Sequence, residues 1–343
     1  MVLGKYIIMK IAIHHREGSF SDGWIKYCQD SNIEFKIVNA YANDIINQIK
    51  GCDCFFWHHN HTNYKDKLFA KQLLFSLENM GIKVFPDFNT CWHFDDKVGQ
   101  KYLFESINAP IVPTYVYYDK QSALEWANNT TYPKVFKLKG GASSTNVTLL
   151  KNKRECKSII NKAFSKGFKS QNYWSLFKDK FKLLFKGKAR ILDVIKFLLY
   201  CLFPFLSNSR LNPREIGYVY FQDFIPENDY DTRLIIIENK AYGMHRKVRT
   251  GDFRASGSSE YSYEPIRKDV IKLGFEIADK LKLQAAAFDF IYKSNGSPLL
   301  VEVSYGFGTS GSNKCKGYWD RSLNFNPCQI RPYEWILDNV LSK

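Results

Sequence analysis

The stretch that decides the fold is AAFDFIYKSNGSPLLVEVS, residues 286–304, which predicts two apolar strands joined by a tight turn. Asn295 and Gly296 lie between the two β-rich runs, and this pair favours a two-residue hairpin turn because both residues tolerate a positive φ. With that turn, Asp289 lies directly opposite Glu302. Ser304 is two residues beyond Glu302 and therefore shares its face of the strand.

Two carboxylates that face each other across a hairpin destabilise the sheet unless a cation lies beside them. Oxygen ligands of this kind suit Mg²⁺, which usually binds substrate phosphates as well. The hairpin therefore indicates a metal site at Asp289 and Glu302. Two alternatives stay open at this point: one carboxylate lies on a solvated face, or the strands pair in another register.

The composition indicates an anionic partner but not a nucleic acid. The chain has 343 residues, which suits two or three domains, and 45% of them are hydrophobic. Its net charge of +15 is concentrated, because residues 151–190 hold 13 Lys/Arg and 2 Asp/Glu. A nucleic-acid-binding protein usually spreads its positive charge over a face or stripe. We therefore expect a local anionic surface as partner and no nucleic acid.

The cysteines and the first residues favour a cytoplasmic location. The eight cysteines are scattered and form no CxxC pair, so neither a zinc site nor a disulfide framework is indicated. A reducing cytoplasm is the simpler interpretation. Residues 1–10 lack a long apolar run followed by a small-residue cleavage site, so we expect no signal peptide.

Residues 1–95 predict an N-terminal α/β domain with a parallel sheet, because short strands alternate with helices. The expected strands are 10–15, 34–38, 52–58 and 82–85, and the expected helices are 23–30, 45–50 and 64–80. Histidines follow two of these strands at their carboxyl ends, where parallel sheets bind ligands; they are His14, His15, His58, His59 and His61. They either contact a substrate or are loop histidines with ordinary hydrogen bonds.

A loop of small residues, GGASSTN at 140–146, joins the expected strands 132–139 and 147–150. Backbone N–H groups of such a loop can wrap a phosphate group, and Lys137 would bring positive charge to the same place. The GxxxxGK[ST] pattern of a P-loop is absent from the sequence. The alternative is an ordinary hairpin with a Gly-Gly turn.

Residues 151–215 predict a basic helical insertion. Phe177, Phe181, Leu184 and Phe185 recur at helical spacing with lysines between them, which is typical of a basic amphipathic helix. The apolar run 191–206 is too short and too interrupted to span a bilayer. One interpretation places residues 170–206 on an anionic membrane surface, as a peripheral attachment at its inner face. The other is a helical pair packed on the protein, with solvated lysines.

Taken in order, these segments resemble the ATP-grasp superfamily. The run DTRLIIIENKAYGMHRKVRTGDFRASGS, residues 231–258, closely resembles the matching part of the ribosomal-protein glutamate ligase branch. The resemblance implies an α/β (α+β) protein with the ATP-grasp fold and an N-terminal Rossmann-like (pre-ATP-grasp) domain. The implied units are the N-terminal domain 1–95, a small subdomain 96–150 with the phosphate loop, the insertion 151–215, and a C-terminal subdomain 216–343 with the metal site.

The resemblance also implies roles for single residues. Those implied to contact the nucleotide phosphates are Lys97, Lys137, Gly140, Gly141 and Ser143. Those implied to bind the adenosine are the hinge residues Gln222, Asp223, Phe224 and Ile225, with Asp231 near the ribose. Arg246 and Arg254 match basic residues that face the γ-phosphate and an acyl phosphate.

The implied metal ligands are Asp289 and Glu302, with Ser304 as the third. The family pattern here is Glu-x-Asn, so Ser304 stands in place of an asparagine. A hydroxyl can bind Mg²⁺ but is a poorer ligand than the oxygen of an amide.

The resemblance implies a ligase that uses ATP and Mg²⁺ to activate a carboxylate as an acyl phosphate and joins it to an amine. The runs VEVSYGFG at 301–308 and GYWDRSLNF at 317–325 also resemble ATP-grasp proteins of surface-polysaccharide gene clusters, which implies a small-molecule or glycan substrate in capsule or LPS biosynthesis. One alternative is a kinase that phosphorylates a sugar or polyol hydroxyl. The other, suggested by Ser304 and the basic insertion, is a non-catalytic, membrane-peripheral nucleotide-binding scaffold.

Overall fold

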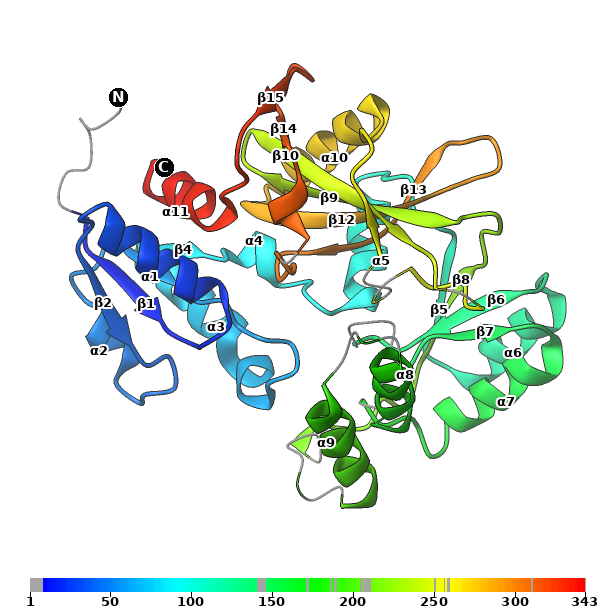
Figure 1. The fold of residues 1–343 in the computed structure, drawn as a ribbon. Helices are drawn as coiled ribbons and strands as arrows, with labels where there is room; N and C mark the ends of the chain where they lie inside the picture. Colours follow the sequence, from blue (N-terminus) through cyan, green and yellow to red (C-terminus); the bar gives the residue numbers. More distant parts are fainter. Residues whose placement is uncertain are drawn as a thin grey trace.

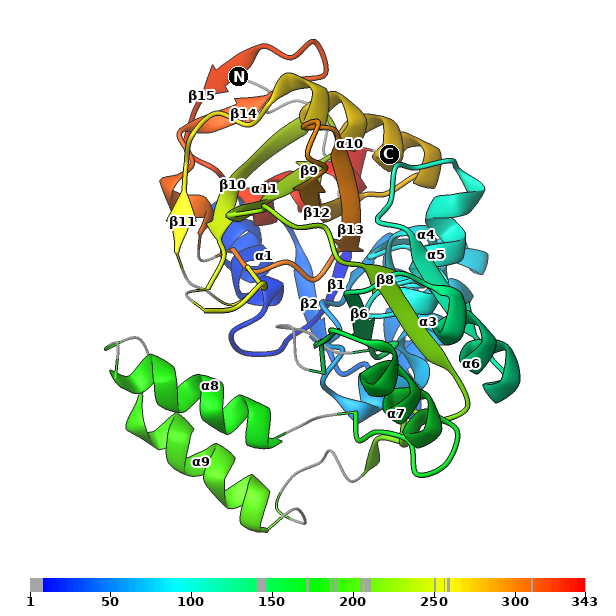
Figure 2. The ribbon, with the colours of Figure 1, turned by 90° about the vertical axis from the view of Figure 1, so that its right-hand side faces the viewer.

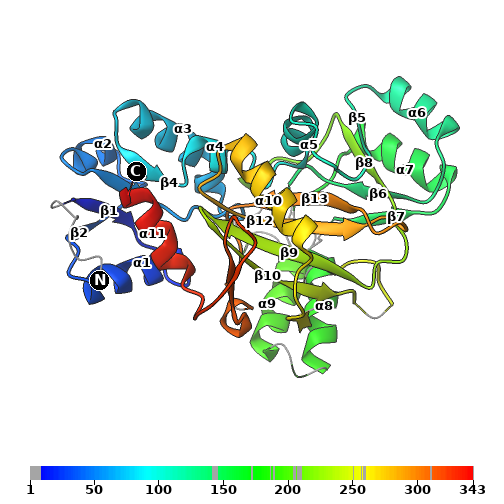
Figure 3. The ribbon, with the colours of Figure 1, turned by 90° about the horizontal axis from the view of Figure 1, so that it is seen from above.

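Among the residues that the computed structural model describes, the chain forms three β-sheets, one in each of three units (Figure 1). The described residues are 9–140, 146–170, 173–185, 187, 190–203, 206, 211–249, 251–255, 257, 260–309 and 311–342. Seen from above, the N-terminal unit and the unit with the second four-stranded sheet, which we call the small sheet, lie at opposite ends (Figure 3). The seven-stranded sheet, which we call the large sheet, lies between them.

The N-terminal unit contains a parallel sheet in the order β2-β1-β3-β4, which confirms the predicted α/β pattern. Its strands are β1 (Ile11–His14), β2 (Phe35–Val38), β3 (Cys54–Phe56) and β4 (Lys83–Phe85). Its helices are α1 (Phe20–Asp30), α2 (Ile45–Ile49), α3 (Tyr64–Asn79) and α4 (Phe88–Cys91). The central strands β1 and β3 are buried along their whole length, as expected of a parallel sheet that is covered on both faces, whereas the edge strand β2 is partly exposed.

The last helix of the chain, α11 (Pro332–Ser342), also belongs to the N-terminal unit. It packs against α1 (Figure 1), and the Tyr27 hydroxyl donates a hydrogen bond to Asp338 Oδ1 at 2.9 Å. Gly23 of α1 lies so close to Tyr333 that an added Cβ would be 2.1 Å from that ring. The segment predicted as one C-terminal subdomain, 216–343, therefore ends in a helix that completes the first unit.

The small-sheet unit contains an antiparallel sheet in the order β5-β8-β6-β7. Its elements are β5 (Thr114–Tyr117), α6 (Lys120–Asn129), β6 (Lys134–Lys137), β7 (Thr148–Leu150), α7 (Lys153–Ala163) and β8 (Val219–Asp223). Helix α7 packs against α6 through buried Cys156 and Ile160. Helix α7 thus belongs to this unit, so the inserted segment is shorter than the predicted 151–215. Strand β8 also belongs to it rather than to the predicted C-terminal subdomain 216–343.

The inserted segment carries two helices, α8 (Tyr173–Phe185) and α9 (Ile191–Leu202), which pack against each other beside the rest of the molecule (Figure 2). Its two ends meet at its base. Phe168 N donates to Glu215 O at 2.8 Å and Glu215 N donates to Phe168 O at 2.9 Å, forming an antiparallel bridge.

The large-sheet unit has the strand order β13-β12-β9-β10-β14-β15, with β11 added on β10. Its elements are α5 (Lys97–Ser106), β9 (Tyr230–Ile237), β10 (Lys240–Lys247), β11 (Tyr261–Ser262), α10 (Lys268–Leu281), β12 (Ala285–Tyr292), β13 (Pro298–Ser304), β14 (Gly317–Trp319) and β15 (Phe325–Pro327). Helix α10 covers one face, where Gly274 allows close contact with Leu234. The other face packs toward the N-terminal unit through Ile235 and Ile237.

The hairpin of β12 and β13 has the predicted strands but not the predicted turn. Its loop has three residues, 294–296, in which Gly296 has a φ of +79° and donates its N–H to Lys293 O at 2.8 Å. Tyr292 therefore pairs with Pro298, one residue away from the expected register. A β-bulge after Asp289 leaves Val301 without a partner in the pairing and restores the predicted pairing of Asp289 with Glu302.

Candidate functional site

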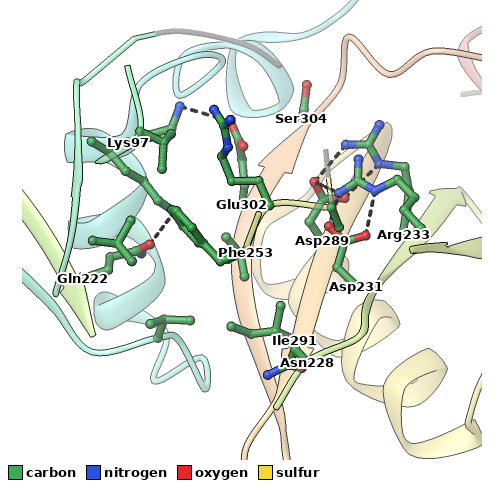
Figure 4. Close-up of a pocket in the computed structure, with 18 of the residues that line it drawn as sticks. Lys97, Gln222, Asn228, Asp231, Arg233, Phe253, Asp289, Ile291, Glu302 and Ser304 are labelled. Atoms are coloured by element: carbon green, nitrogen blue, oxygen red, sulfur yellow. Dashed lines mark hydrogen bonds and ion pairs between the residues drawn. The ribbon is translucent and has the colours of Figure 1, made fainter. Parts of the chain in front are cut away.

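A cavity of about 410 Å³ lies where the small sheet and the large sheet meet, within the range typical of small-molecule sites. Twelve of the predicted site residues line it: Lys97, Lys137, Gln222, Asp223, Phe224, Ile225, Asp231, Arg246, Arg254, Asp289, Glu302 and Ser304. The charged side chains that Figure 4 labels come from α5 and from strands of the large sheet. The predicted roles remain predictions, but their residues share one cavity.

The β-bulge decides which side chains of β13 reach this cavity. Successive residues of a regular strand point to opposite faces. At a bulge two residues oppose one on the partner strand, and here Val301 and Glu302 both line the cavity. Glu302 and Ser304 thus lie on the cavity side together with an apolar side chain from the same strand.

Asp289 already has two cationic partners from the protein itself. Arg233 donates from Nε and Nη2 to its two oxygens at 2.8 Å each, and Arg246 Nη2 donates to Oδ2 at 2.9 Å. Burial alone would raise the pKa of the Asp289 carboxyl, but Arg233 and Arg246 outweigh it and hold that pKa below its ordinary value. These arginines, rather than a metal alone, stabilise the first of the two opposed carboxylates.

Glu302 has a cationic partner on its other side. Lys97 Nζ lies 3.5 Å from Glu302 Oε1, and Lys97 begins helix α5 (Figure 4). Burial lowers the pKa of Lys97, but Glu302 and Asp95 outweigh this effect, so its pKa lies above the ordinary value. Lys97 is therefore a buried, charged group at the cavity wall, and its phosphate contact stays a prediction.

Arg246 and Asp231 form a buried pair. Arg246 donates from Nε and Nη2 to both oxygens of Asp231, at 2.7 Å and 2.5 Å, and the two residues pair directly across β9 and β10. With Asp289 and Arg233 they make a network of two carboxylates and two guanidinium groups. Asp231 therefore contacts Arg246 in this structure, and its ribose contact stays a prediction.

Lys137 and Gln222 meet on neighbouring strands of the small sheet. Lys137 Nζ donates to Gln222 Oε1 at 2.5 Å, and the amide nitrogen of Gln222 donates to Thr114 and Tyr220. Burial, followed by the positive charge of Lys97, lowers the pKa of Lys137 to about 8. No carboxylate bonds directly to this lysine among the described residues, so an anionic ligand would relieve its burial cost.

The chain leaves the small sheet at Asp223 and enters the large sheet at Tyr230. Asp223 accepts from Lys134 at 2.5 Å, and Phe224 and Ile225 follow outside any strand. Asn228 fixes this link: its Nδ2 donates to Tyr292 O at 2.9 Å, and Tyr292 N donates to its Oδ1 at 2.8 Å. The predicted hinge is thus a connection held against strand β12.

The other predicted residues lie in loops. Arg254 donates from Nε and Nη2 to Asp252, with its shortest contact at 2.6 Å, and its side chain is 18% exposed. Gly140 does not line the cavity but packs against Asp95, where an added Cβ would lie 3.0 Å from Oδ2. Gly141 and Ser143 lie outside the described residues.

Of the histidines after β3, only His61 lines the cavity. His58 accepts from Phe20 N and stacks on the Phe20 ring at 3.9 Å, and His59 is buried beside Tyr305. Nε2 of His61 is buried and has no hydrogen-bond partner among the described residues. Burial lowers its pKa although Asp95 and Glu302 oppose this. His58 and His59 are thus structural, whereas His61 can meet a ligand.

Sequence reasoning missed Arg233, Asn228 and Phe253, which also line the cavity. Arg233 could have been found, because it is two residues beyond Asp231 and so shares its face of the strand. Asn228 and Phe253 lie outside regular strands, and no periodicity points to them. The Phe253 ring contacts Phe224 edge-on at 5.9 Å and so closes the hinge side of the cavity.

The residues at the end of the hairpin fit a divalent cation. Two carboxylates and the Ser304 hydroxyl are hard oxygen donors on one cavity wall. A carboxylate offers about four acceptor positions. Arg233 and Arg246 donate three hydrogen bonds to Asp289, so one position is left for a cation. Glu302 would be shared between the cation and Lys97.

Comparisons with known proteins bear on the fold of the chain. Residues 212–319 match the family model of the RimK-like ATP-grasp domain. The search of the curated proteins finds no match. A solved RimK domain ATP-grasp protein from Sphaerobacter thermophilus DSM 20745 is 14% identical, with a TM-score of 0.59 over 97% of this chain and 99% of the other.

Two further structures have the same overall fold. D-cycloserine synthetase DcsG is 10% identical, with a TM-score of 0.59 over 97% of this chain and 99% of the other. D-alanine–D-alanine ligase from Bacillus anthracis, complexed with ATP, is 14% identical, with a TM-score of 0.53 over 97% and 96%. At these identities the likeness establishes the fold, and it confirms the predicted architecture.

Proposed function

Because the chain has the ATP-grasp fold and carries a RimK-like ATP-grasp domain, we propose that this protein is an ATP- and Mg²⁺-dependent ligase that joins a carboxylate to an amine. The observation that carries the proposal is a single cavity containing buried lysines, two opposed carboxylates and an arginine-rich wall. That set of charges matches a nucleotide triphosphate with its cation better than it matches an uncharged ligand.

The apolar half of the cavity suits the adenine base. Val112 and Val135 come from the small-sheet side, Ile291 and Val301 from the large sheet, and Phe224 from the link between them. If the adenine ring lies between these side chains, the phosphates of the nucleotide point toward Lys137 and Lys97. The backbone of the link would then lie along the edge of the base, as predicted for the hinge.

Asp289, Glu302 and Ser304 are the residues that would hold Mg²⁺. When bound, this cation neutralises negative charge on the phosphate oxygens during transfer. The protein's own contribution is electrostatic: Lys137 and Arg254 stabilise the transferred group from the other sides. Arg246 and Arg233 keep Asp289 ionised, because they favour its charged form over the neutral one.

In the reaction that we propose, a substrate carboxylate oxygen attacks the γ-phosphorus, the bond to the β-phosphate oxygen breaks, and ADP leaves. The products of this step are an acyl phosphate and ADP. An amine nitrogen then attacks the acyl carbon, phosphate leaves with the electrons of the C–O bond, and the amine loses a proton. The result is an amide and inorganic phosphate.

The finer proposal concerns the substrate. The runs at 301–308 and 317–325 resemble ATP-grasp proteins of surface-polysaccharide gene clusters, and part of the first run, Ser304, Gly306 and Phe307, lines the cavity. We therefore place the reaction in surface-polysaccharide biosynthesis, with a glycan or small-molecule acceptor. This proposal is supported by the position of Ser304, Gly306 and Phe307 in the cavity where we place the nucleotide.

The test is product identification with a matched variant. The protein, ATP and Mg²⁺ are incubated with panels of carboxylates, amines and sugars, and the products are read by mass spectrometry. We expect an amide product and ADP formation that depends on the amine. Stable phosphorylation of a hydroxyl would replace the ligase proposal with a kinase, and ATP binding without turnover would replace it with a scaffold.

Glu302→Gln tests the metal assignment in the same assay. The change removes one anionic ligand but keeps the size of the side chain. We expect turnover to fall by at least about 10²-fold, while the far-UV circular dichroism spectrum stays unchanged. Turnover within a factor of two of the unmodified protein at saturating Mg²⁺ would contradict the role of Glu302.

A further inference from the structure

Helices α8 and α9 form a hairpin that we call the α8–α9 hairpin, residues 173–202 (Figure 2). The two helices pack against each other, and within the described part of the chain neither has a comparable contact with another element. Tyr173 of α8 and Tyr200 of α9 meet with ring centroids 5.2 Å apart. The hairpin therefore has its own small interface and is not needed to cover the sheets.

The outer face of α9 is apolar. Ile191, Leu192, Ile195, Leu199 and Leu202 are each between 41% and 71% exposed. At 3.6 residues per turn they fall within about 100° of one another around the helix. They thus form one continuous stripe rather than single exposed side chains, and contiguous apolar patches of this kind usually mark an interaction site.

The inner face of α9 carries different residues. Val194 is buried, and the Phe197 ring lies 6.4 Å from the Tyr173 ring of α8. The contact between the two helices therefore uses the side of α9 that is turned away from the apolar stripe. Because the hairpin interface is already filled, the stripe does not form part of it.

Helix α8 has an outer stripe of the same kind. Trp174, Phe181 and Phe185 are 53%, 44% and 78% exposed, and exposed Lys178 lies between them on the same side of the helix. The inner face of α8 holds half-buried Leu176 and Phe177. Large aromatic side chains beside a lysine are typical of helices that lie in a membrane interface.

The positive charge of the α8–α9 hairpin indicates which kind of surface its apolar stripes would bind. Residues 173–203 contain seven Lys/Arg and two Asp/Glu. Arg190 immediately precedes the apolar stripe of α9, and Lys196 lies at its edge. Long basic side chains can keep their charge among lipid headgroups while their stems pack on apolar surface. Among the described residues, no helix is long and apolar enough to cross a bilayer.

We propose that the α8–α9 hairpin docks the protein on the surface of an anionic membrane, with the apolar stripes in the headgroup region and the basic residues at the lipid phosphates. Apolar area and positive charge act together in this mode of binding. A protein partner would not require this excess of positive charge next to the stripes. The proposal is independent of the ligase reaction, because none of the hairpin residues lines the cavity.

The test uses the full-length protein and vesicles of phosphatidylcholine with or without 30% phosphatidylglycerol, in a sedimentation assay. We expect binding to the anionic vesicles that is at least about tenfold stronger than to the neutral ones and that weakens with added salt. The variant Ile191→Ser, Ile195→Ser, Leu199→Ser should lose at least about tenfold of this binding. All three positions are exposed, so the fold should persist.

The matched control is Ile37→Ser, Leu68→Ser, Phe75→Ser. It replaces three apolar residues outside the hairpin that are 52%, 60% and 50% exposed, similar to the stripe residues. It should bind vesicles like the unmodified protein. A second variant replaces residues 171–211 by a short Gly-Ser linker, which is feasible because Phe168 and Glu215 pair at the base. It should lose vesicle binding and keep ATP binding, as measured by calorimetry.

Three results would overturn the proposal. The first is equal binding of the unmodified protein to neutral and anionic vesicles, or no binding to either. The second is unchanged binding of the stripe variant. The third is that analytical ultracentrifugation without lipid shows a dimer that only the stripe variant dissociates, which would assign the stripes to a second copy of this chain.

Discussion

The pKa of Lys137 offers a way to test the proposed nucleotide binding. Burial and the nearby Lys97 lower its pKa to about 8, whereas a lysine in the unfolded chain titrates near 10.4. Below about pH 8 it is charged in both states. Between about pH 8 and about pH 10.4, Lys137 is still protonated in the unfolded chain but largely neutral in the folded one. The free energy of unfolding therefore rises with pH across that window. Bound phosphate would raise the pKa of the lysine again.

We therefore predict that ATP binding at pH 8.5 takes up roughly three quarters of a proton, because that fraction of Lys137 is neutral beforehand. Calorimetry in buffers of different ionisation enthalpy measures the uptake. Lys137→Arg should keep ATP binding but lose the uptake, since arginine stays charged, and Lys137→Met should weaken both. Uptake that persists in Lys137→Arg would assign the proton to another group.

His61 is the second residue for which the structure suggests a specific role. It comes from the N-terminal unit, and its buried Nε2 has no partner among the described residues. Its pKa is lowered by burial, so the ring is neutral at pH 7 and can accept a proton from an amine. Its ring contacts Phe94, which also lines the cavity, and this side of the cavity suits the acceptor.

We predict that His61→Gln raises the KM for the amine at least about fivefold, the size of effect typical of losing one hydrogen bond. The Kd for ATP should stay within twofold. The control is His15→Gln, a histidine in the same unit that does not line the cavity. An equal loss of ATP affinity in His61→Gln would place His61 at the nucleotide instead.

At the scale of elements, the charges of the large sheet form a connected network. Arg233 pairs with Asp289 across β9 and β12, and Asp231 pairs with Arg246 across β9 and β10. Arg246 also reaches Asp289, so two guanidinium groups and two carboxylates lie together with little exposure. Removing one member leaves a buried charge without its partner, which costs more than the pair contributes.

We predict that Arg246→Met lowers the free energy of unfolding by about 3–5 kcal/mol, and that Asp231→Asn in the same chain restores part of it. Urea denaturation of the nucleotide-free protein measures both. The control is Lys26→Met, which breaks an exposed pair with Asp30 and should cost less than about 1 kcal/mol. Strictly additive effects of Arg246→Met and Asp231→Asn would show that the two residues are not coupled.

The hairpin of β12 and β13 shows how local rules can give a correct pairing through an incorrect turn. Gly296 takes a positive φ as expected, but in a three-residue loop. The longer loop shifts the pairing by one residue, and the extra residue at the bulge, Val301, shifts it back. Both deviations follow from sheet twist and packing, because a bulge bends a strand locally, and neither leaves a clear mark in the hairpin sequence.

At the scale of the whole molecule, the cavity depends on how the two sheets are joined. The link between β8 and β9 passes along its edge, and Asn228 fixes the link to Tyr292 by two hydrogen bonds. At the base of the α8–α9 hairpin, Asn146 Nδ2 donates to Ser170 O at 3.0 Å. The end of the predicted phosphate loop is thus connected to the proposed membrane contact.

We predict that Asn228→Ala weakens ATP binding about threefold to tenfold and lowers stability by about 1–2 kcal/mol, because the link loses its attachment to β12. Calorimetry and urea denaturation measure these effects. Asn79→Ala serves as the control, since its side chain donates only to Phe75 O at an exposed helix end. Unchanged ATP affinity in Asn228→Ala would mean that the link is held by other contacts.

The sequence by itself determined the α/β pattern of the first unit and the two strands of the β12–β13 hairpin, and it placed Asp289 opposite Glu302, although through an incorrect turn. These features depend on turn chemistry, on hydrophobic periodicity and on which residues share a face, and all three act between neighbours in the chain. The same local rules indicated the two inserted helices and their basic charge, because amphipathic spacing is visible in a single segment.

Only the tertiary structure decided which charges meet. Arg233 and Arg246 reach Asp289 from two other strands, and Lys97 reaches Glu302 from a helix about 200 residues earlier. It also showed that His61 rather than His58 or His59 lines the cavity, and that the α8–α9 stripes stay exposed. The physical reason is that distances between side chains from remote segments depend on sheet twist and on how the units pack, which no local pattern encodes.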